Sequence, residues 1–400
     1  MSNKLKNDSY FVFKKKIYNI KFFFIKRNKI IADFKDLDSR DFIQKIEIKK
    51  KQTGLSYIPK NTEQKVQSEK VNLNDISVYN LRNKSVLLNS NALYSAENNT
   101  LYYEKWHNEN ENAICVYNSQ DIICHNQNKV KLRHNVSKIK FEEALFLGCA
   151  FPTNYFHFFL EMVSRSAYIE SIPNGNKLPL LLSQKVLHIE SFKKIIEIFF
   201  KDYNVVYLDD NYLYEVQNLW YVTSPNTVLP NIRLGHKFEA KHTKIRAESI
   251  NYLREKCINF FNSKNTTKET FSKIFIKRKS EVRSYNQEEI EKCASNYGFK
   301  SVYFEDLNFE EQIITLQNAA YLVGPTGAAW TNLIFAKSGA KGLIWAGSNW
   351  GSSSMFSTIA EIVNFDLNYI IFESRSAIYH EDFNLDVDVF EQNLIKLLNL

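Results

Sequence analysis

Residues 153–165 (TNYFHFFLEMVSR) carry polar side chains at spacings that suit acid–base chemistry. Asn154, His157, Glu161 and Arg165 follow one another at i, i+3, i+7 and i+11, which places all four on one face of a helix. Most other positions are aromatic or aliphatic, so this polar stripe must face water, a partner or a cleft, because buried polar groups need partners. A carboxylate or an imidazole on such a stripe can remove the proton of an attacking hydroxyl group.

A purely structural interpretation of the same stripe stays open. Glu161 and Arg165 are four residues apart and can form an ordinary helix ion pair. His157 would then be a histidine whose ring nitrogens find hydrogen bonds within its own domain. The functional interpretation instead expects His157 and Glu161 to point into a cleft between two domains.

A second candidate is the stretch GPTGAAWTN, residues 324–332, between an apolar strand and a predicted helix. Gly324 and Gly327 remove side chains that would block a ligand, and the N–H groups and dipole of the helix N-terminus attract an anion. Thr326 or Thr331 can add a hydroxyl donor. The alternative is an ordinary Gly-Pro turn, because the spacing is neither GxGxxG nor GxxxxGK[ST].

Cations follow another apolar strand, KIFIK, at Lys277, Arg278 and Arg283. A guanidinium offers phosphate oxygens a fork of donors, whereas a lysine offers a point charge. Such cations would stabilise the charge that develops on a phosphate leaving group. The alternative is a solvated basic strand end, which is common in so Lys-rich a chain.

Strands and helices alternate from about residue 140 onward, which predicts a parallel sheet with right-handed crossovers. The expected strands are LPLLLS, NVVYLD, LWYVTS, KIFIKRK, KSVYFED, AYLVGPTG and KGLIWAG, and the expected helices are SFKKIIEIFFKDY, NQEEIEKCASNYG, NFEEQIITLQNA and AAWTNLIFA. Residues 71–135 instead contain short β-like runs separated by Asn-rich turns, which predicts an antiparallel meander. Ligands of doubly wound sheets bind at the carboxyl ends of strands, where the Gly-rich stretch falls.

The N-terminal part of the chain is strongly basic. Residues 1–60 hold 16 Lys and Arg against 6 Asp and Glu, a balance of +10, so with a formal charge of +8 for the whole chain the remaining residues are slightly acidic. This distribution argues against a nucleic-acid-binding core, which would carry its basic stripe on the folded domain. Residues 10–31 fit either a basic amphipathic segment on an anionic membrane surface or an element that packs on its own domain. Residues 48–70 are polar without periodicity, which predicts a linker.

The remaining composition excludes several classes. The five cysteines are scattered without metal-ligand spacing, so neither a disulfide framework nor a zinc site is expected, which favours a reducing cytoplasm. No apolar run approaches the roughly 18 residues that span a bilayer, and lysines break the first apolar stretch, so no signal peptide is expected. The acidic pairs Asp36/Asp38 and Asp386/Asp388 are expected at the surface, so no metal site is predicted.

Taken in their order along the chain, the three polar segments resemble the signature blocks of glycosyltransferase family 61 and its bacterial capsular-polysaccharide relatives, over about residues 140–350. The positions of the Gly-rich stretch that match the family pattern are Gly324, Pro325, Gly327, Ala328, Thr331, Asn332 and Phe335. The departures are Thr326, Ala329 and Trp330, together with Trp345, which stands where the family often has an acid. Arg278 and Arg283 match the strand-end block, and Lys277 stands where an arginine is common.

The resemblance implies an α/β fold of GT-B type, with two Rossmann-type domains that face a cleft, together with a basic N-terminal arm and a β-meander. We expect the arm and linker in residues 1–70, an acceptor-side α/β domain with the meander in 71–230, and a nucleotide-sugar-binding domain in 231–400. The implied reaction is inverting, metal-independent and cofactor-free transfer of a sugar from a nucleotide-sugar donor. The implied acceptor is a glycan or lipid-linked glycan in bacterial capsule or surface-polysaccharide synthesis.

The implied roles divide among the segments. Glu161 is the first choice for the catalytic base and His157 the second, while Asn154 and Arg165 would orient the acceptor. The expected donor-binding residues are Lys277, Arg278, Arg283, Gly324, Thr326, Gly327, Ala328, Thr331 and Asn332.

The expected location is the cytoplasm, with residues 10–31 able to bind the inner face of the cytoplasmic membrane. A non-catalytic family member that binds a glycan or a synthase partner is the alternative. A dehydrogenase is disfavoured because no strand–GxGxxG–helix unit with a later ribose-binding acid occurs.

Overall fold

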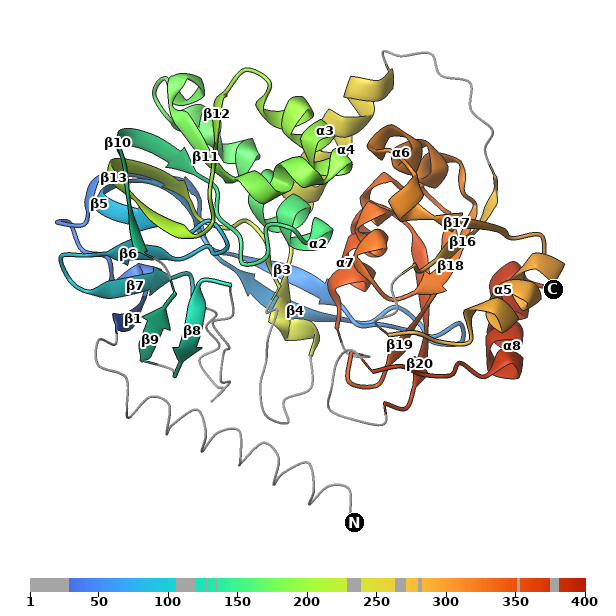
Figure 1. Cartoon of the computed structure of the whole chain (residues 1–400). Helices are drawn as coiled ribbons and strands as arrows, with labels where there is room; N and C mark the ends of the chain where they lie inside the picture. The colour runs from blue at the N-terminus through green and yellow to red at the C-terminus, as the bar shows by residue number, and fades with distance from the viewer. Residues whose placement is uncertain are drawn as a thin grey trace, which may run out of the picture. The chain divides into compact units, whose positions relative to one another are not determined.

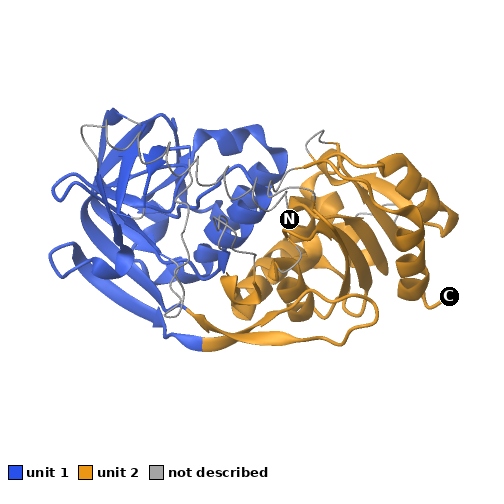
Figure 2. Cartoon of the chain, turned by 90° about the horizontal axis from the view of Figure 1, so that it is seen from below, with its two compact units in different colours: residues 1–52, 74–236 blue, residues 53–73, 237–400 orange. Residues whose placement is uncertain are grey.

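The computed structural model describes residues 29–105, 120–126, 128–133, 135–228, 239–262, 271–279, 283–350, 353–374 and 381–400. The chain divides into two compact units, Met1–Gln52 with Asn74–His236 and Thr53–Leu73 with Lys237–Leu400 (Figure 2). The basic segment expected at residues 10–31 lies outside the described residues except for its last three, which belong to the first strand. Cys115 and the β-like run AICVYN also lie outside them.

The first unit is built on one mixed sheet. Its strands are β1 (Lys29–Asp33), β2 (Phe42–Lys49), β5 (Ile76–Val86), β6 (Leu93–Ser95), β7 (Thr100–Tyr103), β8 (Ile122–His125), β9 (Lys129–Leu132), β10 (Asn135–Phe146), β11 (Pro179–Ser183), β12 (Asn204–Leu208) and β13 (Tyr212–Val222). A short strand, β14 (Thr227–Val228), follows. The spatial order is β12-β11-β10-β13-β5-β6-β7-β1-β9-β8, with β2 paired to β5.

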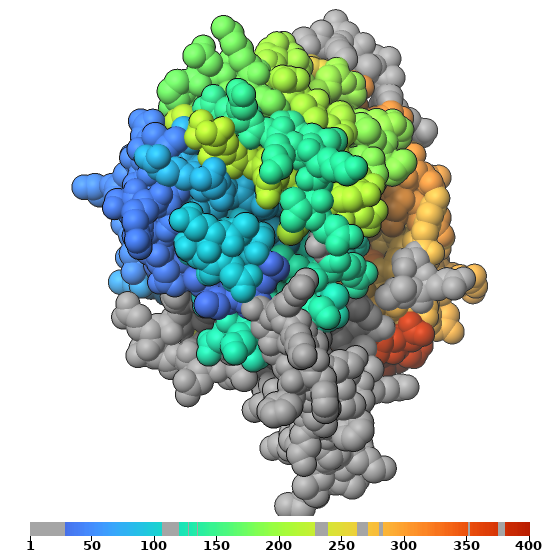
Figure 3. Space-filling model, turned by 60° about the vertical axis from the view of Figure 1, so that its left-hand side comes forward, coloured from blue at the N-terminus to red at the C-terminus, as the bar shows by residue number. Residues whose placement is uncertain are grey.

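The predicted meander and the predicted parallel strands both occur in this unit, but in one sheet. Strands β5, β6 and β7 pair antiparallel in succession. Strands β10 to β13 pair parallel, and β13 then joins the meander through an antiparallel pair with β5. The blue and cyan residues of the meander therefore border directly on the teal and green residues of β10 to β13 in the space-filling view (Figure 3).

Helical segments of the first unit follow β10 and β11. They are α2 (Tyr155–His157), a π-helical turn (Phe158–Met162), a 3-10 helix (Val163–Ser171) and α3 (Glu190–Phe200), with shorter 3-10 turns at Phe34–Asp36, Gly175–Lys177 and Gln184–His188. The sequence of α3 shows why it forms, because Phe192, Ile195 and Phe199 recur at helical spacing and are buried. Lys193 and Glu197 lie on its exposed side.

The second unit contains a parallel sheet. Its described strands are β16 (Lys273–Lys277), β17 (Lys300–Tyr303), β18 (Tyr321–Pro325), β19 (Lys341–Gly347) and β20 (Asp366–Phe372), in the order β17-β16-β18-β19-β20. All four pairings are parallel. The chain moves outward from β16 to β17 and then returns past β16 to β18, so the topological switch point lies between β16 and β18.

Helices cover both faces of this sheet (Figure 1). They are α4 (Ala247–Asn262), α5 (Gln287–Asn296), α6 (Phe309–Asn318), a 3-10 helix η8 (Ala328–Phe335), α7 (Met355–Ile362) and α8 (Val387–Leu398), with 3-10 turns at Ala240–His242 and Phe304–Asp306 and a short strand β15 (Thr243–Lys244). Ile290 of α5 and Phe390 of α8 pack on Phe275 and Trp345 of the sheet. Helix η8 contacts α4, α6 and α7 on the other face. The mixed α/β class is confirmed, and AAWTNLIFA is helical, but of the tighter 3-10 form.

The linker predicted for residues 48–70 is wrong. This segment contributes to β2 and forms most of a two-stranded sheet, in which β3 (Gln52–Tyr57) pairs with β4 (Ser68–Leu73). Residues 53–73 belong to the second unit. The Oγ atom of Ser56 donates to the carbonyl of Ala240 at 2.6 Å, and Lys60 Nζ lies 2.6 Å from Asp366 Oδ1. Polar groups make these attachments, so the segment shows no apolar periodicity.

Of the two acidic pairs expected at the surface, Asp386 has a local structural use. Its side chain accepts hydrogen bonds from the backbone N–H groups of Asp388 and Val389 and so caps α8. No helix among the described residues is long and apolar enough to cross a bilayer.

Candidate functional site

In the first unit, the helix that begins at Tyr155 brings His157 and Glu161 together. The Nδ1 atom of His157 lies 2.9 Å from Oε2 of Glu161. Asn154 caps this helix, because its side-chain oxygen accepts a hydrogen bond of 3.0 Å from the N–H of Phe156. The side chains of His157 and Glu161 are 13% and 12% exposed, so the pair is held by its surroundings and still reaches solvent.

Apolar groups surround this pair. The ring of Phe151 lies 5.0 Å from the ring of His157, and the ring of Phe156 lies 5.3 Å from it. Burial and the nearby Glu161 carboxylate raise the pKa of the Cys149 thiol above its ordinary value. A protonated thiol is a poor nucleophile, so the chemistry available here is proton transfer by the imidazole or the carboxylate.

Arg165 does not form the helix ion pair with Glu161 that the structural interpretation proposed. Its Nε donates to the backbone carbonyl of Glu161 at 3.0 Å, and its Nη1 donates to the carbonyl of Val222. Its charge is paired with Glu104, at 3.2 Å between Nη2 and Oε1. The Arg165 side chain is fully buried, so any orienting effect on an acceptor must pass through other residues.

In the second unit, the Gly-rich stretch begins where β18 approaches β16. A Cβ atom on Gly324 would lie 2.7 Å from the Cβ of Ile276, so glycine is required for the two strands to pack. The N–H of Thr326 then donates to the carbonyl of Trp345 at 2.9 Å. Gly327 is extended, and η8 begins at the next residue, Ala328.

Arg278, just after β16, is tied to this stretch. Its Nη2 donates to the carbonyl of Thr326, and its Nη1 donates to the carbonyl of Arg283 at 2.9 Å. Its own N–H donates to Oε1 of Gln287 at 2.8 Å. A Cβ built on Gly327 would be 3.5 Å from Nη2 of Arg278, so the guanidinium lies beside the start of η8.

The electrostatic environment of Arg278 and Arg283 favours the binding of an anion. Burial and the neighbouring Arg283 guanidinium lower the pKa of Arg278 to about 10, and burial also lowers the pKa of Arg283. These shifts mean that the surroundings disfavour the two positive charges, and a bound anion would relieve that cost. The residues that line the adjoining pocket are Arg278, Arg283, Pro325, Thr326, Trp345, Gly347, Asn349, Trp350, Phe372, Ser374, Glu381 and Phe383.

Comparison with known protein families identifies the chain. The family model described as Glycosyltransferase 61 matches residues 155–343, from the first residue of α2 into β19. Residues 155–343 of the chain are therefore assigned to glycosyltransferase family 61. A comparison with curated proteins found no match. The matched range contains the His157–Glu161 pair of the first unit. It also contains Arg278 and the Gly-rich stretch of the second unit, so both candidate sites lie within the residues that match the family.

In this glycosyltransferase, Arg278, Arg283 and Thr326 lie together at the pocket, with Gly327 and Ala328 beside it. Lys277 lies elsewhere. Its Nζ pairs with Oε2 of Glu291 at 2.6 Å and sits over the ring of Tyr303, and the bond to Glu291 raises the pKa of Lys277. Successive residues of a strand point to opposite faces, so Lys277 and its neighbour Arg278 diverge, and the expected contact of Lys277 with the donor is not supported.

Three further residues expected to bind the donor are buried. Gly324 allows strands β16 and β18 to pack closely against each other. Thr331 lies inside η8, and Nδ2 of Asn332 donates to Oε1 of Gln312 at 3.2 Å. The three positions are buried in this structure, and their contact with a donor stays a prediction.

Several residues of the site were not expected from the sequence. The indole Nε1 of Trp330 donates to the carbonyl of Pro325 at 3.0 Å and closes the loop. Asn349, Trp350 and Phe372 follow or end β19 and β20 and line the pocket. The rule that ligands lie at the carboxyl ends of parallel strands could have indicated all three. No group of three or more potential metal ligands occurs among the described residues.

Proposed function

We propose that this glycosyltransferase transfers a sugar from a nucleotide-sugar donor to a glycan hydroxyl, with inversion at the anomeric carbon. The observation that carries the proposal is the position of Arg278, Arg283 and the Gly-rich stretch. They lie at the carboxyl ends of β16 and β18, at the switch point where doubly wound sheets bind ligands. Two half-buried guanidiniums and a helix N-terminus there suit the diphosphate of a nucleotide sugar.

The proposed reaction breaks the bond between the anomeric carbon and the diphosphate oxygen, which leaves with the electron pair. Negative charge grows on the diphosphate as that bond breaks. Arg278 and Arg283 would stabilise this charge more in the transition state than in the bound donor, and such donors are typically worth on the order of 10²-fold in rate. We propose that no metal ion is needed for this step.

The acceptor oxygen attacks the anomeric carbon from the opposite side and loses its proton to a base. Glu161 is the proposed base, because its carboxylate reaches solvent and touches an imidazole that can stabilise it. His157 would then orient the carboxylate or the acceptor hydroxyl. The reverse assignment, with His157 as base and Glu161 holding its ring, uses the same contact.

Further parts of the proposal rest on the resemblance to glycosyltransferase family 61. A GT-B-like arrangement would bring the proton acceptor of one unit and the anion site of the other to one donor–acceptor pair. We propose capsule or surface-polysaccharide synthesis in a bacterium as the setting, with a glycan or lipid-linked glycan as acceptor. A cytoplasmic protein bound at the inner face of the membrane through its basic N-terminal segment would fit this setting.

The test is a thermal-shift panel of the full chain with UDP-, GDP-, CMP- and dTDP-sugars. At least one should raise the melting temperature, because a ligand that binds only the folded state stabilises it. Arg278→Met should abolish that rise. If no nucleotide sugar shifts the wild-type melting temperature, the transferase proposal fails. If a nucleotide sugar binds but no transfer or hydrolysis follows, the non-catalytic alternative is favoured.

A further inference from the structure

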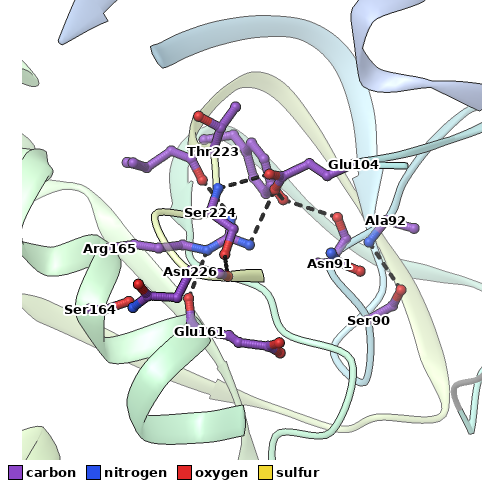
Figure 4. Close-up of polar contacts among 12 residues, drawn as sticks. Ser90, Asn91, Ala92, Glu104, Glu161, Ser164, Arg165, Thr223, Ser224 and Asn226 are labelled. Carbon is purple, nitrogen blue, oxygen red and sulfur yellow. Dashed lines mark hydrogen bonds and ion pairs between the residues drawn. The ribbon is translucent and has the colours of Figure 1, made fainter. Parts of the chain in front are cut away.

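A buried polar network surrounds the turn that carries Glu161 (Figure 4). Glu161 lies in the π-helical turn, where the N–H of Val163 donates to the carbonyl of Phe158, five residues earlier. A 3-10 helix follows at once. The backbone bonding pattern therefore changes within a few residues, and side chains can satisfy carbonyl groups at such a junction.

Side chains do bond these carbonyl groups. The carbonyl of Leu160 accepts hydrogen bonds from Oγ of Ser164 at 2.6 Å and from Nδ2 of Asn226 at 2.8 Å. The carbonyl of Glu161 accepts from Nε of Arg165 at 3.0 Å. The irregular turn is thus held partly by side chains, and one of them is a buried cation.

That cation depends on Glu104, which follows β7 and is distant from Arg165 in sequence. Oε1 of Glu104 lies 3.2 Å from Arg165 Nη2 and accepts a hydrogen bond of 2.5 Å from the hydroxyl of Tyr221. Oε2 accepts from the N–H of Ser224 at 2.8 Å. Glu104 therefore fixes the Arg165 guanidinium against the end of β13, where it also donates to the carbonyl of Val222.

We propose that Glu104 is a positioning residue for the His157–Glu161 pair and acts through Arg165 on the backbone of Glu161. The proposal rests on the proposed function, in which Glu161 or His157 takes the acceptor proton. Glu104 itself lies behind the turn and would not touch the substrate. Without its charge, Arg165 is a buried cation with no carboxylate beside it in this network, and it must move or draw in water. The carbonyl of Glu161 then loses its fixed donor, and the carboxylate loses its alignment with His157.

The test compares Glu104→Gln with a matched control, Glu143→Gln. Glu143 also lies in the first unit and accepts a hydrogen bond from an aromatic donor of β13, the Nε1 of Trp220 at 2.7 Å. The two variants lose the same charge and one comparable bond. In Glu104→Gln we expect kcat to fall about 10- to 100-fold, with the donor KM within about twofold. The control should keep both constants.

A spectroscopic measurement tests the positioning role of Glu104 without measuring turnover. In protein labelled with 15N-histidine, the imidazole resonances of His157, assigned with a His157→Gln variant, should move in Glu104→Gln and stay in Glu143→Gln. If they stay in both, the positioning role is overturned, whether or not the chain transfers sugar. Absence of transfer in the wild type would count against the proposed function alone.

The double variant Glu104→Gln/Arg165→Met separates positioning from general stability. It removes both buried charges, so the melting temperature should recover relative to Glu104→Gln. The value of kcat should stay low, because the Glu161 carbonyl still lacks its donor. If kcat recovers together with the melting temperature, Glu104 only stabilises the fold and the proposal is wrong.

Discussion

The Nδ1 atom of His157 lies 2.9 Å from a carboxylate oxygen of Glu161, one turn further along the same helical segment. This contact joins the two side chains that can accept a proton in the polar stripe of α2 and the π-helical turn. Arg165 does not pair with the Glu161 carboxylate. Its guanidinium instead turns inward, where it bonds the backbone carbonyl of Glu161 and the carboxylate of Glu104.

The first prediction concerns this contact. Glu161→Gln keeps the shape of the side chain and removes its basicity, so kcat should fall about 10²- to 10⁴-fold. Binding of the nucleotide sugar, measured by calorimetry, should change less than about twofold. Glu190→Gln, an exposed carboxylate of α3 that pairs with Lys193, is the control and should keep full activity. Equal activity of Glu161→Gln and wild type would remove Glu161 from the mechanism.

The second prediction separates neighbouring cations. Arg278→Met should weaken donor binding or slow transfer about 10²-fold, because Arg278 lies at the proposed diphosphate site. Lys277→Met should stay within about twofold of wild type, because Lys277 pairs with Glu291 and is turned away. The kcat and KM values of both variants show which of the two cations contributes to donor binding and transfer. A larger loss in Lys277→Met than in Arg278→Met would contradict the assignment of the site.

The third prediction uses the pKa of Cys149. Burial and Glu161 raise this pKa, so at any given pH the thiolate population is smaller than for a free cysteine. Iodoacetamide should therefore label Cys149 much more slowly in the native chain than in urea between pH 7 and about 9. Mass spectrometry of the peptide gives both rates. Rapid native labelling would show that the thiol is reactive and that proton transfer is not the only chemistry available there.

The fourth prediction compares two glycines of the loop. Gly324→Ala should lower the free energy of unfolding by about 1–3 kcal/mol, because its Cβ would overlap Ile276. Gly327→Ala should cost little, since its backbone is extended and its Cβ would meet only Arg278 Nη2 at 3.5 Å. Urea unfolding of the two variants tests the difference. Similar stabilities would show that β16 and β18 separate easily.

The fifth prediction concerns the attachment of residues 53–73. Lys60 Nζ reaches Asp366 Oδ1 at 2.6 Å and Asn368 Oδ1 at 2.9 Å, and its side chain is 14% exposed. Lys60→Met should destabilise the second unit by about 1–2 kcal/mol. Lys396→Met removes only the exposed pair with Glu63 and should lower the free energy of unfolding much less, because solvent screens that pair. The melting temperatures of the two variants should therefore differ in that order.

Much of the second unit could be predicted from the sequence, because its strands are short, apolar and separated by amphipathic helices. The order of those strands could not, since neighbours in a sheet are set by packing between distant segments. The linker predicted for residues 48–70 is wrong because Ser56 and Lys60 attach this segment through polar bonds, which leave no apolar periodicity in the sequence. The spacing predicts that Arg165 shares a helical face with Glu161, but the segment contains a π-helical turn and Arg165 turns inward to Glu104, which no sequence spacing connects to it.

The membership of residues 53–73 in the second unit also has a consequence for biosynthesis. These residues leave the ribosome before residues 74–236 of the first unit, yet the groups that hold them, Ala240, Thr358 and Asp366, are made much later. The second unit therefore cannot complete its fold as a continuous piece of emerging chain, and an early segment must stay available while residues 74–236 are synthesised. For the same reason a genetic exchange that moved only residues 237–400 into another protein would leave part of that unit behind.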